Sequence, residues 1–219
     1  QFDSSAHYYL KAIPLSEKLN DRRQMASYYN GLGNVLYQLG DFEKAISYMK
    51  MAADIKLKDN DLLYYAVING NIAAAMQRIG NFKEAISILR DSEKKLKSFD
   101  NVEILANIYN SLGSAYLLES KFKNLDSAEY YYAKNISLIT KSEHEPFRLA
   151  AIINISDVYI EKKQYDKAET NLLKALALTQ QLSRNGERIN SYGALSSLYE
   201  QKNDFKNALR FKNMQNGLR

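Results

Sequence analysis

The stretch Gly40-Asp41-Phe42-Glu43-Lys44-Ala45-Ile46-Ser47 decides the fold, because it returns forty residues later as Gly80-Asn81-Phe82-Lys83-Glu84-Ala85-Ile86-Ser87. Later copies, with an aromatic residue three positions before an alanine, end at Ala168 and Ala208, and Ala128 belongs to a further copy. The five alanines are 40, 43, 40 and 40 residues apart, and the extra three residues fall within 121–125. A period of this length is typical of proteins built from stacked repeats.

Each copy is preceded by residues at the spacing of one face of an α-helix, which are Tyr29, Leu32, Gly33 and Leu36 in the first copy. The third member of this pattern is small in all five copies: Gly33, Ala73, Gly113, Ser156 and Ser196. A small side chain lets a neighbouring helix approach closely. That requirement explains a glycine in a helix interior, where it costs about 1 kcal/mol relative to alanine.

A second helix is predicted after each aromatic residue, with Ala45, Met49 and Ala52 on one face in the first copy. Asp41, Asp166 and Asp204 are expected to cap these second helices or to lie in their first turns. One such hairpin cannot bury its apolar faces alone, so neighbouring hairpins must stack. We therefore predict an all-α protein of eleven helices, a right-handed α-solenoid of antiparallel helix pairs. Residues 1–219 form one solenoid, with a half repeat (second helix only) at 1–20 and hairpins at 21–60, 61–100, 101–143, 144–183 and 184–219.

These features resemble the tetratricopeptide repeat, whose signature positions are the small residue in the first helix, the Gly-Asp-aromatic turn and the alanine that opens the second helix. The resemblance covers nearly the whole chain. It departs from the family pattern in its period, which is usually about 34 residues, and in lacking the proline that closes the second helix. Long-period versions are similar to those of bacterial peptide-sensing regulators, sensor kinases and kinesin light chain. Because Ala6, Leu10 and Ile13 match a second helix without its first, we expect a fragment of a longer protein, with a half-repeat cap as the alternative.

Composition excludes several classes of protein. The net charge is +5, and basic and acidic residues are interspersed, so nucleic-acid binding through this region is not expected. No apolar run of 18 residues is present, so no membrane span is expected in this segment. The absence of cysteine rules out disulfides and thiolate sites. The compartment stays open between cytoplasm and periplasm, and the missing cysteines favour the periplasm slightly.

No catalytic constellation is visible in the sequence. The two histidines, His7 and His144, lie in different repeats, whereas a histidine metal site needs several ligands that converge. Gly31-Leu32-Gly33 lies within a predicted helix and lacks the preceding strand that a nucleotide-binding loop requires. We expect no metal, no cofactor and no enzymatic activity.

A second stripe of the first helices carries asparagines, although asparagine is a poor residue for a helix interior. Its amide supplies a donor and an acceptor together, which suits binding to the backbone of an extended peptide. In tetratricopeptide proteins that bind peptides, the first helices line a concave groove, and such asparagines hold the peptide backbone. The resemblance thus implies a ligand-binding concave face at Asn30, Asn34, Tyr37, Asn71, Gln77, Asn107, Asn110 and Asp157. The alternative is that these amides only face water.

Taken with the resemblance, these residues predict a non-catalytic scaffold whose groove holds a peptide or partner protein. The long period favours the sensory or regulatory region of a larger bacterial signalling protein, either a histidine kinase or a transcription regulator. The alternative is a freestanding adaptor that assembles a protein complex. A homodimer is compatible with either role.

Overall fold

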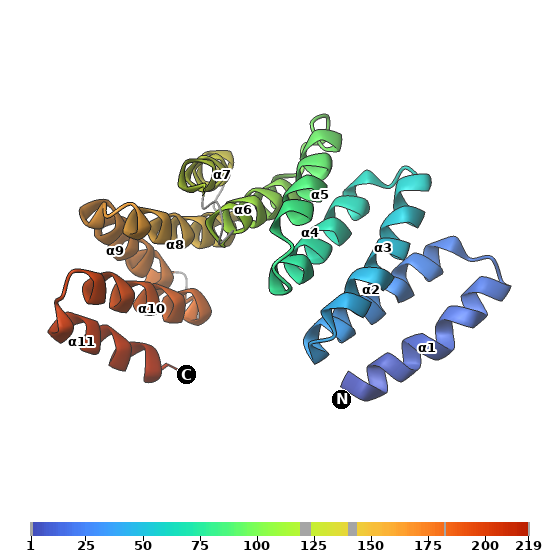
Figure 1. Cartoon of the computed structure of the whole chain (residues 1–219), viewed down its shortest axis with the longest axis horizontal. Coiled ribbons are helices and arrows are strands. Elements are labelled where there is room, and N and C mark those ends of the chain that lie inside the picture. Colours follow the sequence, from blue (N-terminus) through green and yellow to red (C-terminus); the bar gives the residue numbers. More distant parts are fainter. Residues whose placement is uncertain (1, 119–123, 140–143, 182, 219) are drawn as a thin grey trace. The chain divides into compact units, whose positions relative to one another are not determined.

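The computed structural model describes residues 2–118, 124–139, 144–181 and 183–218, and within these ranges the chain forms eleven α-helices and no strand. This confirms the predicted all-α class and helix number. The helices are α1 (Phe2–Lys18), α2 (Arg22–Leu39), α3 (Phe42–Lys58), α4 (Leu62–Arg78), α5 (Phe82–Lys95), α6 (Val102–Leu118), α7 (Leu125–Leu138), α8 (Glu145–Glu161), α9 (Tyr165–Gln181), α10 (Asn185–Gln201) and α11 (Phe205–Asn216) (Figure 1).

The chain divides into two compact units. Unit 1 spans Gln1–Ser120 and contains α1 to α6, and unit 2 spans Lys121–Arg219 and contains α7 to α11. Within each unit, every helix packs against the next one along the chain. Alternate helices also touch, since α4 contacts α2 and α6 in unit 1, and α8 contacts α10 in unit 2. In unit 1 the first helices α2, α4 and α6 therefore form one layer. The division of the chain into repeats at the boundaries given above remains a prediction.

Residues in the left-handed backbone conformation follow several of the helices at a regular interval. Positive φ angles occur at Asn20 (51°), Gly40 (84°), Asn60 (56°), Gly80 (76°), Lys163 (59°), Ser183 (53°) and Asn203 (57°). A single residue in this conformation ends a helix and turns the chain back, and glycine adopts it without the steric cost of a Cβ. Over residues 20–80 and again over 163–203 the chain therefore turns every twenty residues, which produces two helices per forty-residue period.

Side-chain caps open many of the helices. In the described ranges, six helices follow an Asp or Asn whose side-chain oxygen accepts a hydrogen bond from the backbone N–H three residues later: Asp21, Asp41, Asp61, Asn101, Asn124 and Asp204. Asp41 and Asp204 therefore cap second helices as predicted, and Asp166 lies in the first turn of α9. Each cap stabilises its helix by about 1 kcal/mol.

The small residue of the first helix lies against the alanine that opens the second. A Cβ added at Gly33 would lie 3.1 Å from the carbonyl oxygen of Ala45 and 2.5 Å from Cγ of Met49. At the equivalent place in the last hairpin, Oγ of the buried Ser196 donates a 3.0 Å hydrogen bond to the carbonyl oxygen of Ala208. The close approach of the two helices is therefore the reason for a small residue there, as the sequence pattern indicated.

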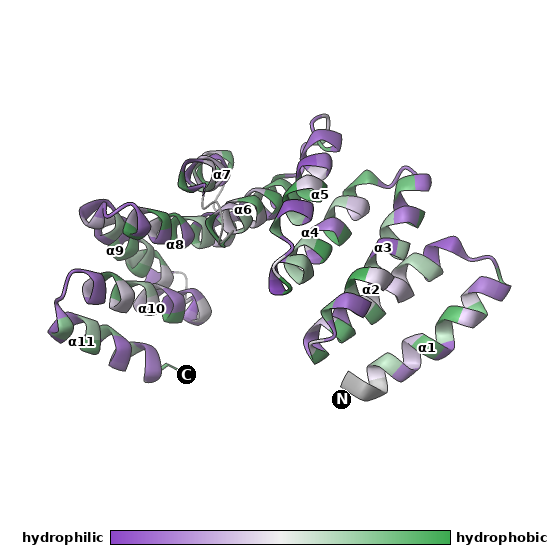
Figure 2. Cartoon of the chain, in the orientation of Figure 1, coloured by the Kyte–Doolittle hydropathy of each residue, from purple (hydrophilic) through white to green (hydrophobic). Residues whose placement is uncertain are grey.

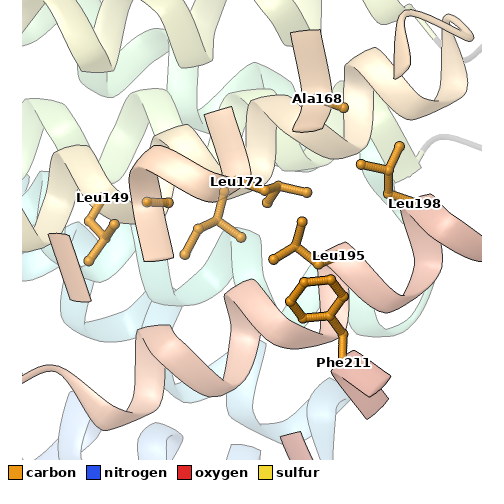
Figure 3. Close-up of a cluster of buried hydrophobic side chains, with 8 residues drawn as sticks. Leu149, Ala168, Leu172, Leu195, Leu198 and Phe211 are labelled. Atoms are coloured by element: carbon orange, nitrogen blue, oxygen red, sulfur yellow. The ribbon is translucent and has the colours of Figure 1, made fainter. Parts of the chain in front are cut away.

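The core lies between the helices and is made of the predicted apolar stripes. Most helices carry both hydrophobic and hydrophilic residues along their length (Figure 2). In unit 2, the fully buried Leu149, Leu172 and Leu195 come from α8, α9 and α10, and Ala168 and Phe211 extend the same cluster (Figure 3). Three helices thus contribute leucines to one core, which explains why a single hairpin would not be stable alone.

An ion pair between a lysine and a glutamate, which we call the clasp, joins successive hairpins of unit 2. Lys202, at the end of α10, lies 2.7 Å from a carboxylate oxygen of Glu169 on α9, and the Tyr199 hydroxyl donates a 2.6 Å hydrogen bond to the same carboxylate. Forty residues earlier, Lys162 lies 2.5 Å from Glu129 in the same arrangement. Burial and the hydrogen bond to Glu169 raise the pKa of Tyr199 to about 12, and Lys202 lowers the pKa of Glu169. The clasp therefore ties each first helix to the second helix of the hairpin before it.

Candidate functional site

Unit 1 contains a groove of about 500 Å³ in which the layer of first helices meets the start of α3. We call it the α4 groove, because α4 contributes three residues to its lining. The groove is lined by Tyr37, Phe42, Ala74, Gln77, Arg78, Asn110, Ser111, Ser114 and Leu118. Three of the predicted ligand-binding residues, Tyr37, Gln77 and Asn110, are brought together here from three different helices.

The hairpin turn supplies the aromatic end of the groove. Tyr37 lies three residues before the left-handed Gly40, and Phe42 is the first residue of α3. The turn reverses the chain between them, so that the two rings meet edge to face with their centroids 5.4 Å apart. Such a pair is favourable by about 1 kcal/mol beyond its buried area. We call the rings of Tyr37 and Phe42 the aromatic wall; Phe42 belongs to the sequence motif that defines the repeat.

Polar groups from α4 and α6 line the groove beside the aromatic rings. The Oε1 atom of Gln77 accepts a 3.0 Å hydrogen bond from the Ser114 hydroxyl, and its Nε2 atom donates a 3.4 Å hydrogen bond to the carbonyl oxygen of Ser111. Both partners are on α6, so this amide is held in one orientation. An oriented amide is a better donor and acceptor for a bound backbone than a freely rotating one, because less side-chain entropy is lost on binding.

Arg78 is the only charged residue among the residues that line the α4 groove, as far as the structure describes them. Its guanidinium carbon lies 5.4 Å from the centroid of the Phe42 ring, which is a cation–π contact. Since no carboxylate lines the groove in the described ranges, its formal charge is positive.

The other predicted residues of unit 1 lie outside the α4 groove. Asn30 on α2 is only 8% exposed, and its Nδ2 atom donates a long 3.4 Å hydrogen bond to the Tyr64 hydroxyl. Among the described residues its Oδ1 atom has no hydrogen-bond partner. Asn34 and Asn107 are exposed, and Asn71 is half-buried. Their role in binding stays a prediction.

Asp157 is on α8 in unit 2 and is not among the residues that line the α4 groove. Its side chain is largely buried, and burial together with the nearby Glu161 carboxylate raises its pKa to about 6. A carboxyl group in this range changes charge near neutral pH, which makes Asp157 sensitive to pH whether or not it contacts a ligand.

Sequence reasoning did not identify Phe42 and Arg78 as groove residues. Phe42 was interpreted as a turn residue, which is correct but incomplete, because the turn also directs its ring toward Tyr37. Arg78 follows Gln77 directly. The sequence reasoning selected residues three or four positions apart on one helix face, so it omitted a residue that is adjacent in sequence. The useful signal was the position of both residues at the turn end of the hairpins, where side chains from several helices converge.

The described part of the chain contains no group of three or more His, Asp or Glu side chains that could hold a metal ion. His7 belongs to unit 1 and His144 to unit 2. None of the described helices combines the length and the apolar character needed to cross a membrane.

The sequence profile of the tetratricopeptide repeat matches residues 1–58 and 147–214, which is more than half of the chain. The chain belongs to the tetratricopeptide repeat family. The resemblance inferred from the repeated phrase is thereby confirmed, and the solenoid class is confirmed with it. No curated protein matches this repeat protein at a significant level.

Solved structures share the fold at low sequence identity. BtubC (BKLC) from P. vanneervenii superimposes with a TM-score of 0.80 at 18% identity, over 100% of this repeat protein and 91% of that chain. A signal-transduction ATPase with a tetratricopeptide repeat sensor from Pyrococcus horikoshii gives a TM-score of 0.74 at 17% identity, over 90% of this chain and 30% of that one. NprR, solved in complex with its cognate peptide NprX, gives 0.67 at 18% identity, over 97% and 60%.

Proposed function

We propose that this chain is a non-catalytic scaffold that binds an extended peptide segment of a partner in the α4 groove. The observation that carries the proposal is the convergence of Tyr37, Gln77 and Asn110 from three helices in one groove. An extended peptide exposes a backbone N–H and C=O at each residue, and side-chain amides can satisfy both groups. The aromatic wall provides contact area for one of the peptide's side chains.

The finer role that we propose is the sensory or regulatory region of a larger bacterial signalling protein. Two similar structures support this role: one contains a repeat region named as a sensor, and the other was solved with its cognate peptide. The role is tested by the gene sequence on both sides of codons 1–219. An encoded kinase or DNA-binding domain on either side supports it, whereas start and stop codons that directly flank this region contradict it and favour the freestanding adaptor.

Peptide selection tests the groove. A library of random ten-residue peptides is displayed and selected against the immobilised chain, and the enriched peptides are titrated by fluorescence anisotropy. The test variant is Gln77→Ala with Asn110→Ala, and the matched control is Gln38→Ala with Gln201→Ala, which removes two exposed amides elsewhere. Circular dichroism and thermal unfolding confirm that both variants fold.

We expect enriched peptides to bind the test variant at least tenfold more weakly than the parent chain, because about 1 kcal/mol is lost for each backbone hydrogen bond. The control variant should bind like the parent. Equal binding by test variant and parent would exclude the α4 groove as the site. A selection that enriches no peptide would leave no support for peptide binding.

A further inference from the structure

The α4 groove contains one cation and no anion among its described lining residues, so it favours a ligand with a negative charge. Arg78 is at the C-terminal end of α4, next to the oriented amide of Gln77. Within the described ranges, its guanidinium forms no ion pair, and its contact is with the face of Phe42. The charge of Arg78 is therefore unneutralised in this part of the chain.

The contact with Phe42 restricts the Arg78 side chain before a ligand binds. A guanidinium stacked over a ring loses part of its rotational freedom before binding, while its in-plane N–H groups remain available. Two parallel N–H donors match the two oxygens of a carboxylate, which is the strongest common pairing for this side chain. Lysine at this position would offer a mobile point charge without that geometry.

Apolar surface lies next to this cation. Tyr37 and Phe42 form the aromatic wall, and Leu118 at the end of α6 lines the same groove while 53% exposed. A large aliphatic side chain open to solvent is covered when an apolar group binds, and this burial is favourable by about 25 cal/mol per Å². The groove thus combines a carboxylate partner, an apolar contact and backbone-binding amides within one pocket.

We propose that the α4 groove selects peptides in which an acidic side chain neighbours a large apolar side chain, and that Arg78 is the residue that determines this specificity. The inference rests on the proposed peptide binding and adds the class of ligand. The carboxylate pairs with the Arg78 guanidinium, the apolar side chain packs against Leu118 and the aromatic wall, and Gln77 and Asn110 hold the peptide backbone.

The test uses the full chain and the peptides enriched from the random ten-residue library. Each peptide is synthesised in three forms: with an amidated C-terminus, with a free C-terminus, and amidated with its Asp or Glu changed to Asn or Gln. Each form is titrated against the parent chain, Arg78→Gln, Arg78→Glu and the control Arg23→Gln. Arg23 is an exposed arginine on α2 outside the groove lining, so its substitution removes the same charge from unit 1.

We expect the enriched peptides to contain Asp or Glu beside an apolar residue and to bind Arg78→Gln about tenfold more weakly, with Arg23→Gln unchanged. The neutral form of the peptide should lose the same factor against the parent chain and nothing further against Arg78→Gln. Selection on Arg78→Glu should enrich Lys or Arg at the acidic position. Raising the salt concentration should weaken only the acidic peptides.

Three results would overturn the inference in distinguishable ways. If the peptides depend on Gln77 and Asn110 but bind Arg78→Gln as tightly as the parent chain, the specificity assignment is wrong and the proposed function stands. If binding requires the free C-terminus, the groove recognises a terminal carboxylate and not an acidic side chain. If no peptide depends on the two amides, both the inference and the proposed function fail.

Discussion

Replacing Asp157 by asparagine should stabilise the protein at neutral pH and leave it unchanged in acid. Burial and Glu161 raise the pKa of Asp157 from 3.8 to about 6 in the folded state. The folded state therefore holds this proton more tightly than the unfolded chain, and the free energy of unfolding falls as the pH rises between about 4 and about 6. At about 1.4 kcal/mol per pKa unit, the ionised carboxylate costs roughly 3 kcal/mol above this window. The neutral asparagine avoids that cost.

The assay is urea unfolding followed by circular dichroism at pH 4.0 and pH 7.5, for the parent chain and Asp157→Asn. We expect the variant to be more stable by about 2 to 3 kcal/mol at pH 7.5 and nearly equal to the parent at pH 4.0. Subtracting the parent at each pH removes the contribution of the titrating groups that do not interact with Asp157. The matched control is Glu200→Gln, which neutralises an exposed carboxylate on α10 in the same unit and should change little at either pH.

A gain in stability of the same size at both pH values would refute the reasoning, because it would come from the amide itself and not from removing a charge. A loss of stability at pH 7.5 would show that the ionised carboxylate has a favourable partner. Either result would remove Asp157 as a group that titrates near neutral pH.

Two further predictions concern the packing of the hairpins. Gly33→Ala should destabilise the fold by about 1 to 2 kcal/mol, because its Cβ would lie 2.5 Å from Met49 and the strain exceeds the gain in helix propensity. Gly70→Ala, whose Cβ meets nothing within 4 Å, should stabilise the fold by up to about 1 kcal/mol. Urea unfolding that changes the stability of both variants in the same direction would contradict this prediction. A double-mutant cycle on Glu169 and Lys202 should give a coupling energy of about 0.5 to 1 kcal/mol at neutral pH. This coupling should be lost as the pH falls through the pKa of Glu169, which Lys202 holds below its ordinary value, because protonation of the carboxylate breaks the clasp. A coupling that persists once Glu169 is protonated would refute the ionic account.

The fold could be predicted from the sequence because the same pattern of small, aromatic and alanine residues occurs five times. An isolated glycine such as Gly33 would say little, but its recurrence as a small residue at a fixed distance before an alanine identifies a close helix contact. The structure explains this with Gly33 against Ala45 and Ser196 against Ala208. The twenty-residue interval of left-handed residues was harder to see, because lysine, serine and asparagine share that conformation with glycine.

The site was only partly predictable. Tyr37 and Gln77 are both three residues before a left-handed glycine, so they occupy equivalent places in neighbouring hairpins and meet in the groove. Arg78 reaches the groove through its contact with Phe42, which belongs to a different hairpin. A pattern within one helix contains no information about such a contact, because it depends on how two hairpins stack. The burial of Asn30 against Tyr64 has the same origin.

The most direct test of the central claim is to block the α4 groove chemically. The chain has no cysteine, so Ala74→Cys places a single reactive thiol in the groove lining, and Met51→Cys places one at an exposed position on α3 outside it. Each protein is titrated with an enriched peptide before and after labelling with a bulky maleimide. Labelling at position 74 should abolish binding while labelling at position 51 leaves it unchanged. Full binding by the protein labelled at position 74 would contradict the assignment of the α4 groove as the peptide site.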